Sequence, residues 1–217
     1  MKISKPNIPG ELIAIDSVTT YIEEVMDDDR ELAHLALEGD VQVSTDLARL
    51  DITGSTLKQC IFRDCDLEHA SFEDVVFVGC DFSNSCFHLA YFNRCEFVSC
   101  KFLGTDFSEA VLKYVVITES IFQYANFTKA KFECVSAHST DFSQADMSEA
   151  SIKFFEPIDT RFTGVSFFMT NLRGVDFSGN QIGDITVSEN MHEFRGCSMD
   201  MFQAAGIAQR LGIAIKD

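Results

Sequence analysis

The chain has 217 residues, 46% of them hydrophobic, and its 34 acidic against 17 basic residues give a formal net charge of -17 at pH 7. This acidity argues against direct binding to nucleic acid, which is itself densely negative. The alternative is that the charge only keeps the protein in solution. No stretch reads as a membrane span, and Lys5, Pro6, Pro9 and Glu11 interrupt any secretory signal, so a cytoplasmic location is expected.

Residues 1–44 precede the regular part of the sequence and are expected to form an N-terminal capping segment. An acidic run from Asp27 to Asp29 leads into three leucines between positions 32 and 37. This pattern predicts a short helix near residues 28–38 that ends at Gly39. Such a helix would cover the first open edge of the structure that follows.

Residues 45–187 follow a five-residue register. Every fifth position from Leu47 to Val187 gives 29 positions, and 27 of them are Leu, Ile, Val, Met or Phe. The two exceptions are Ala137 and Pro157, and the residue two places before each position is usually small. Amphipathic helices repeat every 3.6 residues and half-buried strands every 2. A period of five therefore predicts a coiled, turn-rich solenoid whose units stack.

Individual five-residue units carry a family resemblance. The units Ala145 to Glu149 and Thr105 to Glu109 resemble those of pentapeptide-repeat proteins, with a small residue, Asp, an apolar residue and two variable residues. The resemblance implies an all-β fold: a right-handed quadrilateral parallel β-helix with four units per coil. Residues 45–187 would then form about seven coils, and a helical cap would close the C-terminal end.

The two ends of the chain narrow this resemblance. The start, with Met1-Lys2-Ile3 followed by Pro6 and Pro9, and the close resemble the chromosomal Qnr-type proteins of Gram-positive bacteria. In the close, residues 174–178 are followed by a short irregular stretch and an apolar end. That family binds type II topoisomerases, chiefly DNA gyrase with topoisomerase IV as a further candidate, and protects them from quinolones. The resemblance therefore implies a topoisomerase partner and a role in antibiotic resistance.

Residues 188–217 are expected to form a C-terminal helix and dimerisation segment. Ser198 is a candidate N-cap for a helix over residues 199–210. By resemblance, this end of the chain forms a homodimer, and the alternative is a self-contained monomeric cap. The expected contact residues are Met199, Phe202, Ile207, Leu211, Ile213 and Ile215.

With four units per coil, residues twenty positions apart stack in columns, and this sorts the charge into faces. One acidic face contains only two basic residues, Arg49 and Lys129, and a second acidic face contains only one, Lys58. The first face comprises Asp46, Asp66, Glu68, Asp106, Glu109, Asp146 and Glu149. The second comprises Glu96, Glu119, Glu156, Asp159 and Asp176. An acidic rod of this kind is a candidate DNA mimic, because its field would draw it into a basic DNA-binding channel in a salt-sensitive manner.

One column contains both exceptions to the apolar rule, Ala137 and Pro157, one coil apart. Proline lacks an amide proton, so the ladder loses a donor there and the face is expected to bend or bulge. At the preceding corner Tyr114, Cys134 and Phe154 would form an exposed apolar strip, which suggests a partner contact. The alternative is a local packing adjustment around Phe155.

Most of the eight cysteines fall in the small inward slot, where a thiol behaves as a small buried hydrophobe. Cys60, Cys80 and Cys100 would stack about 4.8 Å apart, so a disulfide distance is not excluded, although a cytosolic chain keeps its thiols reduced. No histidine stands at a spacing suited to a metal or a nucleophile, and no glycine-rich loop could hold phosphate. The sequence therefore predicts no enzyme, metal, cofactor or small-molecule substrate.

Two functions remain open on these grounds. The first is a DNA-mimicking protein that binds gyrase. The second is a structural or scaffolding solenoid that binds another protein through the strip at Tyr114, Cys134 and Phe154. Residues 45–187 leave no room for the projecting loops that some Qnr relatives insert, so protection would have to use the surface of the rod itself.

Overall fold

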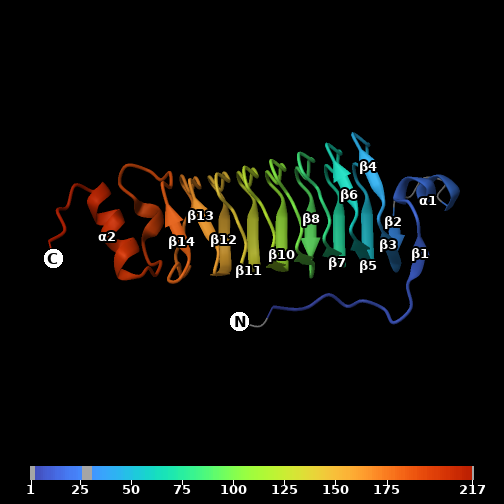
Figure 1. Cartoon of the computed structure of the whole chain (residues 1–217), viewed down its shortest axis with the longest axis horizontal. Coiled ribbons are helices and arrows are strands. Elements are labelled where there is room, and N and C mark those ends of the chain that lie inside the picture. The colour runs from blue at the N-terminus through green and yellow to red at the C-terminus, as the bar shows by residue number, and fades with distance from the viewer. Residues whose placement is uncertain (1–2, 26–30, 217) are drawn as a thin grey trace.

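The chain folds into an elongated parallel β-helix of about eight turns with a short helix at each end (Figure 1). This computed structural model describes residues 3–25 and 31–216. The acidic run Asp27 to Asp29 lies outside the described residues. The register of the strands, rather than their individual lengths, defines the fold.

The elements follow the chain from one end of the rod to the other. The first part comprises β1 (Ile13–Ile15), α1 (Val18–Val25), β2 (Glu31–Ala33), β3 (Leu35–Glu38), β4 (Val41–Val43), β5 (Asp51–Lys58), β6 (Ile61–Arg63) and β7 (Ser71–Val78). The second comprises β8 (Tyr91–Asn93), β9 (Glu96–Val98), β10 (Val111–Thr118), β11 (Lys131–His138), β12 (Ser151–Ile158), β13 (Arg161–Thr163), β14 (Gln181–Gly183), a short 3-10 helix (His192–Phe194) and α2 (Met201–Arg210).

Neighbouring coils pair in parallel with a register of twenty residues. Val115 of β10 stands opposite Val135 of β11, and the same offset joins β5 to β7. The ladder has a regular bonding pattern: the Phe102 amide donates to the Ile121 carbonyl at 2.7 Å, and the Lys101 amide donates to the Cys80 carbonyl at 2.8 Å. This register confirms the predicted arrangement of four five-residue units per coil.

The interior of the rod is a stack of phenylalanine rings. Phe102 is fully buried, with its ring centroid 5.2 Å from that of Phe82 and 4.5 Å from that of Phe122 in the adjacent coils. Both pairs are nearly parallel, at 6° and 12°. Each ring thus packs against its equivalents above and below, so burial of apolar area is continuous along the axis.

The small inward residues have a second role besides leaving room for the rings. Thr105 Oγ1 donates to the Phe82 carbonyl at 2.8 Å, and Ser85 Oγ donates to the Phe62 carbonyl at 2.7 Å. Cys95 Sγ occupies the same place and lies 3.3 Å from the Phe72 carbonyl. The inward cysteines are therefore buried, free thiols that pack in the core, as predicted. Burial raises the pKa of Cys95 to about 12, which keeps the thiol unreactive.

A left-handed residue closes each corner of the coil. Every fifth position from His34 to Asp184 has a positive φ, and Phe154 is the single exception in that series. Most of these residues are not glycine, although the left-handed region costs an ordinary residue about 1–2 kcal/mol. The coil geometry and its ladder therefore hold residues of many types in this conformation.

The N-terminal prediction of a helix over residues 28–38 is wrong for the described part of that range. Residues 31–38 form β2 and β3, which pair with β5. The five-residue frame in fact continues backward through Leu37 and Leu32, but Gln42 breaks the apolar rule and hides the continuation. Gln42 is 7% exposed, and its Nε2 donates to Asp40 Oδ1 at 3.0 Å, so this polar pair is satisfied inside the coil. One further coil thus precedes residue 45.

The N-terminal end is covered by α1 and by an extended arm. The helix inserts Val18, which is 1% exposed, and the Val18 amide donates to Asp40 Oδ2 at 3.0 Å. Residues 3–10 run back along one side of the solenoid toward its middle (Figure 1). The Asn7 amide donates to Asp74 Oδ1 at 2.9 Å, which ties the arm to a corner of the rod.

The C-terminal helix is present, but its N-cap is Asp200 rather than the predicted Ser198. Asp200 accepts from the Gln203 amide at 2.9 Å, and the Gln203 side chain accepts from the Asp200 amide at 3.0 Å, which forms a capping box. Ser198 instead still belongs to the ladder, because it pairs with Asp176 and its carbonyl accepts from the Phe177 amide. Gln203 Nε2 and Arg210 anchor α2 to carbonyls of the last coils.

Candidate interaction surfaces

The first acidic face forms a straight column on the rod. Single parallel bridges run Asp46 to Asp66, then through Cys86 to Asp106, and through Asn126 to Asp146. Asp46, Asp66 and Asp146 are exposed. Glu109 and Glu149 are exposed at the corner after it, and Glu68 is half-buried. The structure therefore brings together the residues that the sequence assigned to this face.

These aspartates also shape the turn in which they lie. Asp106 Oδ1 accepts from the Ser108 amide at 2.9 Å, and Asp146 Oδ1 accepts from the Ser148 amide at 2.9 Å. Asp66 makes the same bond to the Glu68 amide. Each carboxylate is therefore oriented by its own backbone, which fixes the direction of the negative charge along the column.

The second acidic face is divided between two columns. Glu96 and Glu156 lie in one column, connected through Val116 and Ser136. Glu119 and Asp159 occupy corner positions, where each accepts a hydrogen bond from a serine of the preceding coil: Ser99 for Glu119 and Ser139 for Asp159. Glu156 and Asp159 lie three residues apart in one coil, whereas Glu96 lies three coils from Glu156 in the same column, so this face carries its charge less evenly than the first.

The strongest ion pairs of the rod lie away from both acidic faces. Arg94 Nη2 contacts Asp74 Oδ2 at 2.7 Å and also contacts Glu73. The others are Arg63 with Asp81, Lys153 with Glu133, and Arg161 with Asp141. These basic side chains are therefore paired with acids on other columns of the rod.

The Asp74 and Arg94 pair predicts a pH dependence of stability. The Arg94 guanidinium, aided by the Asn7 amide, holds the pKa of Asp74 below its ordinary value despite partial burial. A carboxylate whose pKa is lower in the folded state stabilises the fold fully above the unfolded-state pKa of about 3.9 and loses that contribution as pH falls below it. Asp74→Asn should therefore lower the free energy of unfolding at pH 7, and the difference from the parent should shrink as pH falls below about 3.9 and through the lower folded-state pKa.

Urea unfolding at pH 7, 4 and 2 measures this difference. Asp64→Asn is the matched control, because Asp64 is an exposed aspartate at an equivalent left-handed corner. A loss for Asp74→Asn that stays constant from pH 7 to pH 2 would contradict the assignment of the effect to the ionised carboxylate.

The predicted apolar strip is only partly exposed. Cys134 is 7% exposed, and Tyr114 and Phe154 are half-buried, so the expectation of three exposed side chains is wrong for the middle one. Cys134 is small and lies one coil from each of the two larger aromatic residues. Lys113 Nζ also lies 5.6 Å from the centroid of the Tyr114 ring and covers part of it.

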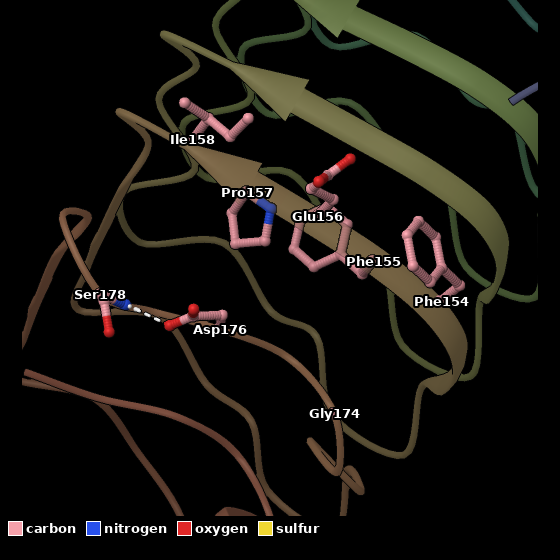
Figure 2. Close-up of a pocket in the computed structure, with 8 residues that line it drawn as sticks. All are labelled: Phe154, Phe155, Glu156, Pro157, Ile158, Gly174, Asp176 and Ser178. Atoms are coloured by element: carbon pink, nitrogen blue, oxygen red, sulfur yellow. Dashed lines mark hydrogen bonds between the residues drawn. The ribbon is translucent and has the colours of Figure 1, made fainter. Parts of the chain in front are cut away.

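The column of Ala137 and Pro157 lies next to the main irregularity of the rod. Ala137 and Pro157 remain in register, but the ladder of β11 and β12 shifts between Phe132, Glu133 and Val135, so that Glu133 pairs with Phe154. The predicted distortion therefore exists, at the corner before Pro157. Asp176, predicted as part of the second acidic face, faces it across the next coil. Sequence reasoning missed its neighbours Gly174 and Ser178, which together with Asp176 and β12 line an open slot (Figure 2).

The predicted dimerisation residues divide into two groups. Met199 and Ile207 pack against the core of the solenoid. Phe202 is 83% exposed, and Leu211, Ile213 and Ile215 are 53%, 54% and 49% exposed. The outer side of α2 and the following tail therefore present an uncovered apolar surface at the end of the rod.

No group of three or more His, Cys, Asp or Glu side chains among the described residues is placed to hold a metal ion. Neither helix in residues 3–25 and 31–216 has the length and apolar character of a membrane-crossing segment.

Comparison with known proteins identifies the repeat. The family model for pentapeptide repeats in eight copies matches residues 51–88, and the model for a pentapeptide repeat region matches residues 70–140. No curated protein sequence matches the chain significantly.

Two solved structures of QnrB1, described as a plasmid-mediated fluoroquinolone resistance protein, are similar in fold. The two structures are of different trypsin-treated variants. One gives a TM-score of 0.57 at 20% identity, over 95% of this chain and 100% of that one. The other gives 0.55 at 20% identity, over 95% and 98%. The family matches show that residues 51–140 contain pentapeptide repeats, and the two QnrB1 structures show that nearly the whole chain shares their fold.

Proposed function

We propose that the protein binds a type II topoisomerase, chiefly DNA gyrase, by mimicking DNA and so protects the enzyme from quinolones. The observation that carries this proposal is the aligned column of Asp46, Asp66, Asp106 and Asp146 along one side of the rod. The likeness in fold to QnrB1, a fluoroquinolone resistance protein, supports it.

The dimensions of the rod agree with this role. Eight coils at about 4.8 Å each give a length of roughly 38 Å. Residues 31–187, which form the coils, contain 23 acidic and 11 basic residues, a net charge of -12. Over that length this is about one negative charge per 3.2 Å, roughly half the density of duplex DNA at one per 1.7 Å. A channel that attracts DNA through basic side chains would attract this rod by the same force.

A homodimer is part of the proposal. The exposed Phe202, Leu211, Ile213 and Ile215 would be covered by the same surface of a second copy, since an isologous contact buries identical patches on both partners. Two rods joined end to end would reach roughly 75 Å, the length of about twenty base pairs at 3.4 Å. Sedimentation of the purified chain gives its oligomeric state.

A supercoiling assay tests the proposal. Purified protein is titrated into DNA gyrase poisoned with ciprofloxacin, at two salt concentrations. Supercoiling should be restored, and the amount of protein required should rise with salt, because screening weakens attraction between exposed charges. Failure to rescue supercoiling at any concentration, with gyrase itself unaffected by the protein, would contradict the proposal.

A further inference from the structure

A slot opens between β12 and residues 171–178 of the next coil (Figure 2). Its volume is about 280 Å³. The lining comprises Phe154, Phe155, Glu156, Pro157, Ile158, Gly174, Asp176 and Ser178. This volume falls just below the usual 300–1,000 Å³ of small-molecule sites. The slot therefore suits a single long side chain better than a separate small molecule.

The slot exists because the ladder fails here. In the neighbouring columns the central residue of each unit donates its amide to the next coil, as Phe142 does to the Arg161 carbonyl at 2.9 Å and Phe167 to the Thr186 carbonyl at 2.8 Å. Pro157 occupies this position and has no amide proton to give to the Asp176 carbonyl. Among the described residues, no backbone hydrogen bond joins residues 151–158 to residues 171–178.

The loss of donors leaves the slot rich in acceptors. The Asp176 carbonyl receives only a long contact, 3.5 Å, from Asn180 Nδ2. The reverse bond, from the Asp176 amide to the Phe155 carbonyl, is missing as well. Carbonyl groups that lack their ladder donors favour a ligand that only donates hydrogen bonds.

The charged groups of the slot also favour a ligand that donates hydrogen bonds, and they favour one with a positive charge. Glu156 and Asp176 are its two ionisable lining residues, both are exposed, and no basic residue lines it. One oxygen of Asp176 accepts from the Ser178 amide at 2.9 Å, which orients the carboxylate, as the dashed line in Figure 2 shows. Among the described residues, Glu156 makes no side-chain hydrogen bond or ion pair.

The walls of the slot favour one kind of cation. Phe154 and Pro157 supply apolar surface, and the half-buried ring of Phe154 lies on β12 at one side of the opening (Figure 2). A guanidinium is planar, weakly hydrated, stacks on aromatic faces and carries five donors and no acceptor. An ammonium is more strongly hydrated and presents three donors from one point, so it gains less from contact with apolar and aromatic walls.

We propose that this slot binds an arginine side chain of a partner protein, with its guanidinium held by Glu156, Asp176 and the main-chain carbonyls that the ladder leaves without donors. The site is separate from the column of Asp46 to Asp146. It does not depend on the proposed function, because arginine binding here and rescue of gyrase are measured independently.

Nuclear magnetic resonance titration of the full chain tests the proposal. The probe is N-acetyl-L-arginine N-methylamide, compared with the corresponding lysine and citrulline compounds. Citrulline keeps the shape of arginine and removes its charge. The arginine probe should shift the amides of residues 153–158 and 174–178, with at least about 5-fold tighter binding than either comparison compound.

Two variants locate the binding. Glu156→Gln combined with Asp176→Asn should weaken binding of the arginine probe about 5-fold or more. Glu96→Gln combined with Glu119→Gln removes the same charge from the same face and should leave binding unchanged. Pro157→Val supplies the missing amide to the Asp176 carbonyl and should weaken binding by about 3-fold.

Several results would overturn the proposal. Shifts spread evenly over the acidic columns would show general attraction to a negative rod instead of a site. Equal binding of citrulline would exclude charge recognition. An equal loss in the control pair, or no change in Pro157→Val, would remove the role of the slot and of its acceptors.

Discussion

Replacement of Phe102 by alanine is expected to lower the free energy of unfolding by about 3–5 kcal/mol. Phe102 is fully buried in the middle of the rod and packs against Phe82 and Phe122 in the adjacent coils and against Phe97 and Phe107 in its own. Truncation removes contacts with all of these rings at once. The stacked coils cannot close the cavity, because their spacing is set by the ladder.

Urea unfolding followed by circular dichroism at 218 nm, a wavelength typical of β-structure, measures the effect. Phe168→Ala is the matched control, because Phe168 has the same side chain but is 43% exposed, and it should cost less than about 1 kcal/mol. Similar losses for the two variants would mean that the ring stack contributes little to the stability of the solenoid.

Reversal of charge on the first acidic face should abolish protection of gyrase. The variant combines Asp106→Lys, Asp146→Lys and Glu149→Lys, which lie along one side of the rod. Each substitution replaces attraction to a basic channel by repulsion. The protein concentration needed for half-maximal rescue should rise by at least about 100-fold, which corresponds to about 2.8 kcal/mol.

The second acidic face supplies a control with the same change in charge. Glu96→Lys, Glu119→Lys and Asp159→Lys alter the total charge equally but on other columns. This variant should retain most of the rescue at moderate salt. If the two triple variants lose rescue to the same extent, the total charge of the rod matters and the first face has no special role.

The register of the rod could be predicted from the sequence because the spacing of the repeats along the chain is fixed. Once four units make a coil, positions such as Asp106 and Asp146 must share a column, and the structure places them so. The first coil could not be predicted, because Asp40 and Gln42 put a polar pair in the two inward positions, where the rule expects a small residue and an apolar one. Only their mutual hydrogen bond makes that exchange tolerable.

Two local features escaped prediction for other reasons. Ser198 and Asp200 are both good N-caps, and the choice between them depends on Ser198 still being held by the Val175 and Phe177 backbone. For the slot, the sequence predicted an irregularity on one side only, at Pro157. The opposite side, at Asp176, depends on the conformation of a later coil, which the repeat pattern does not specify.

The twenty-residue coil determines which insertions and deletions within the repeats keep the surface columns aligned. Removal or addition of twenty residues within the repeats would shorten or extend the rod by about 4.8 Å and return every downstream column to its place. A change of five residues would keep each inward residue inward, yet it would turn everything downstream by a quarter of the circumference. Asp146 would then stand on a different side of the rod from Asp106. A change in length that is not a multiple of twenty therefore rotates the downstream coils about the axis of the rod. The surface pattern excludes such a change even where the core would tolerate it.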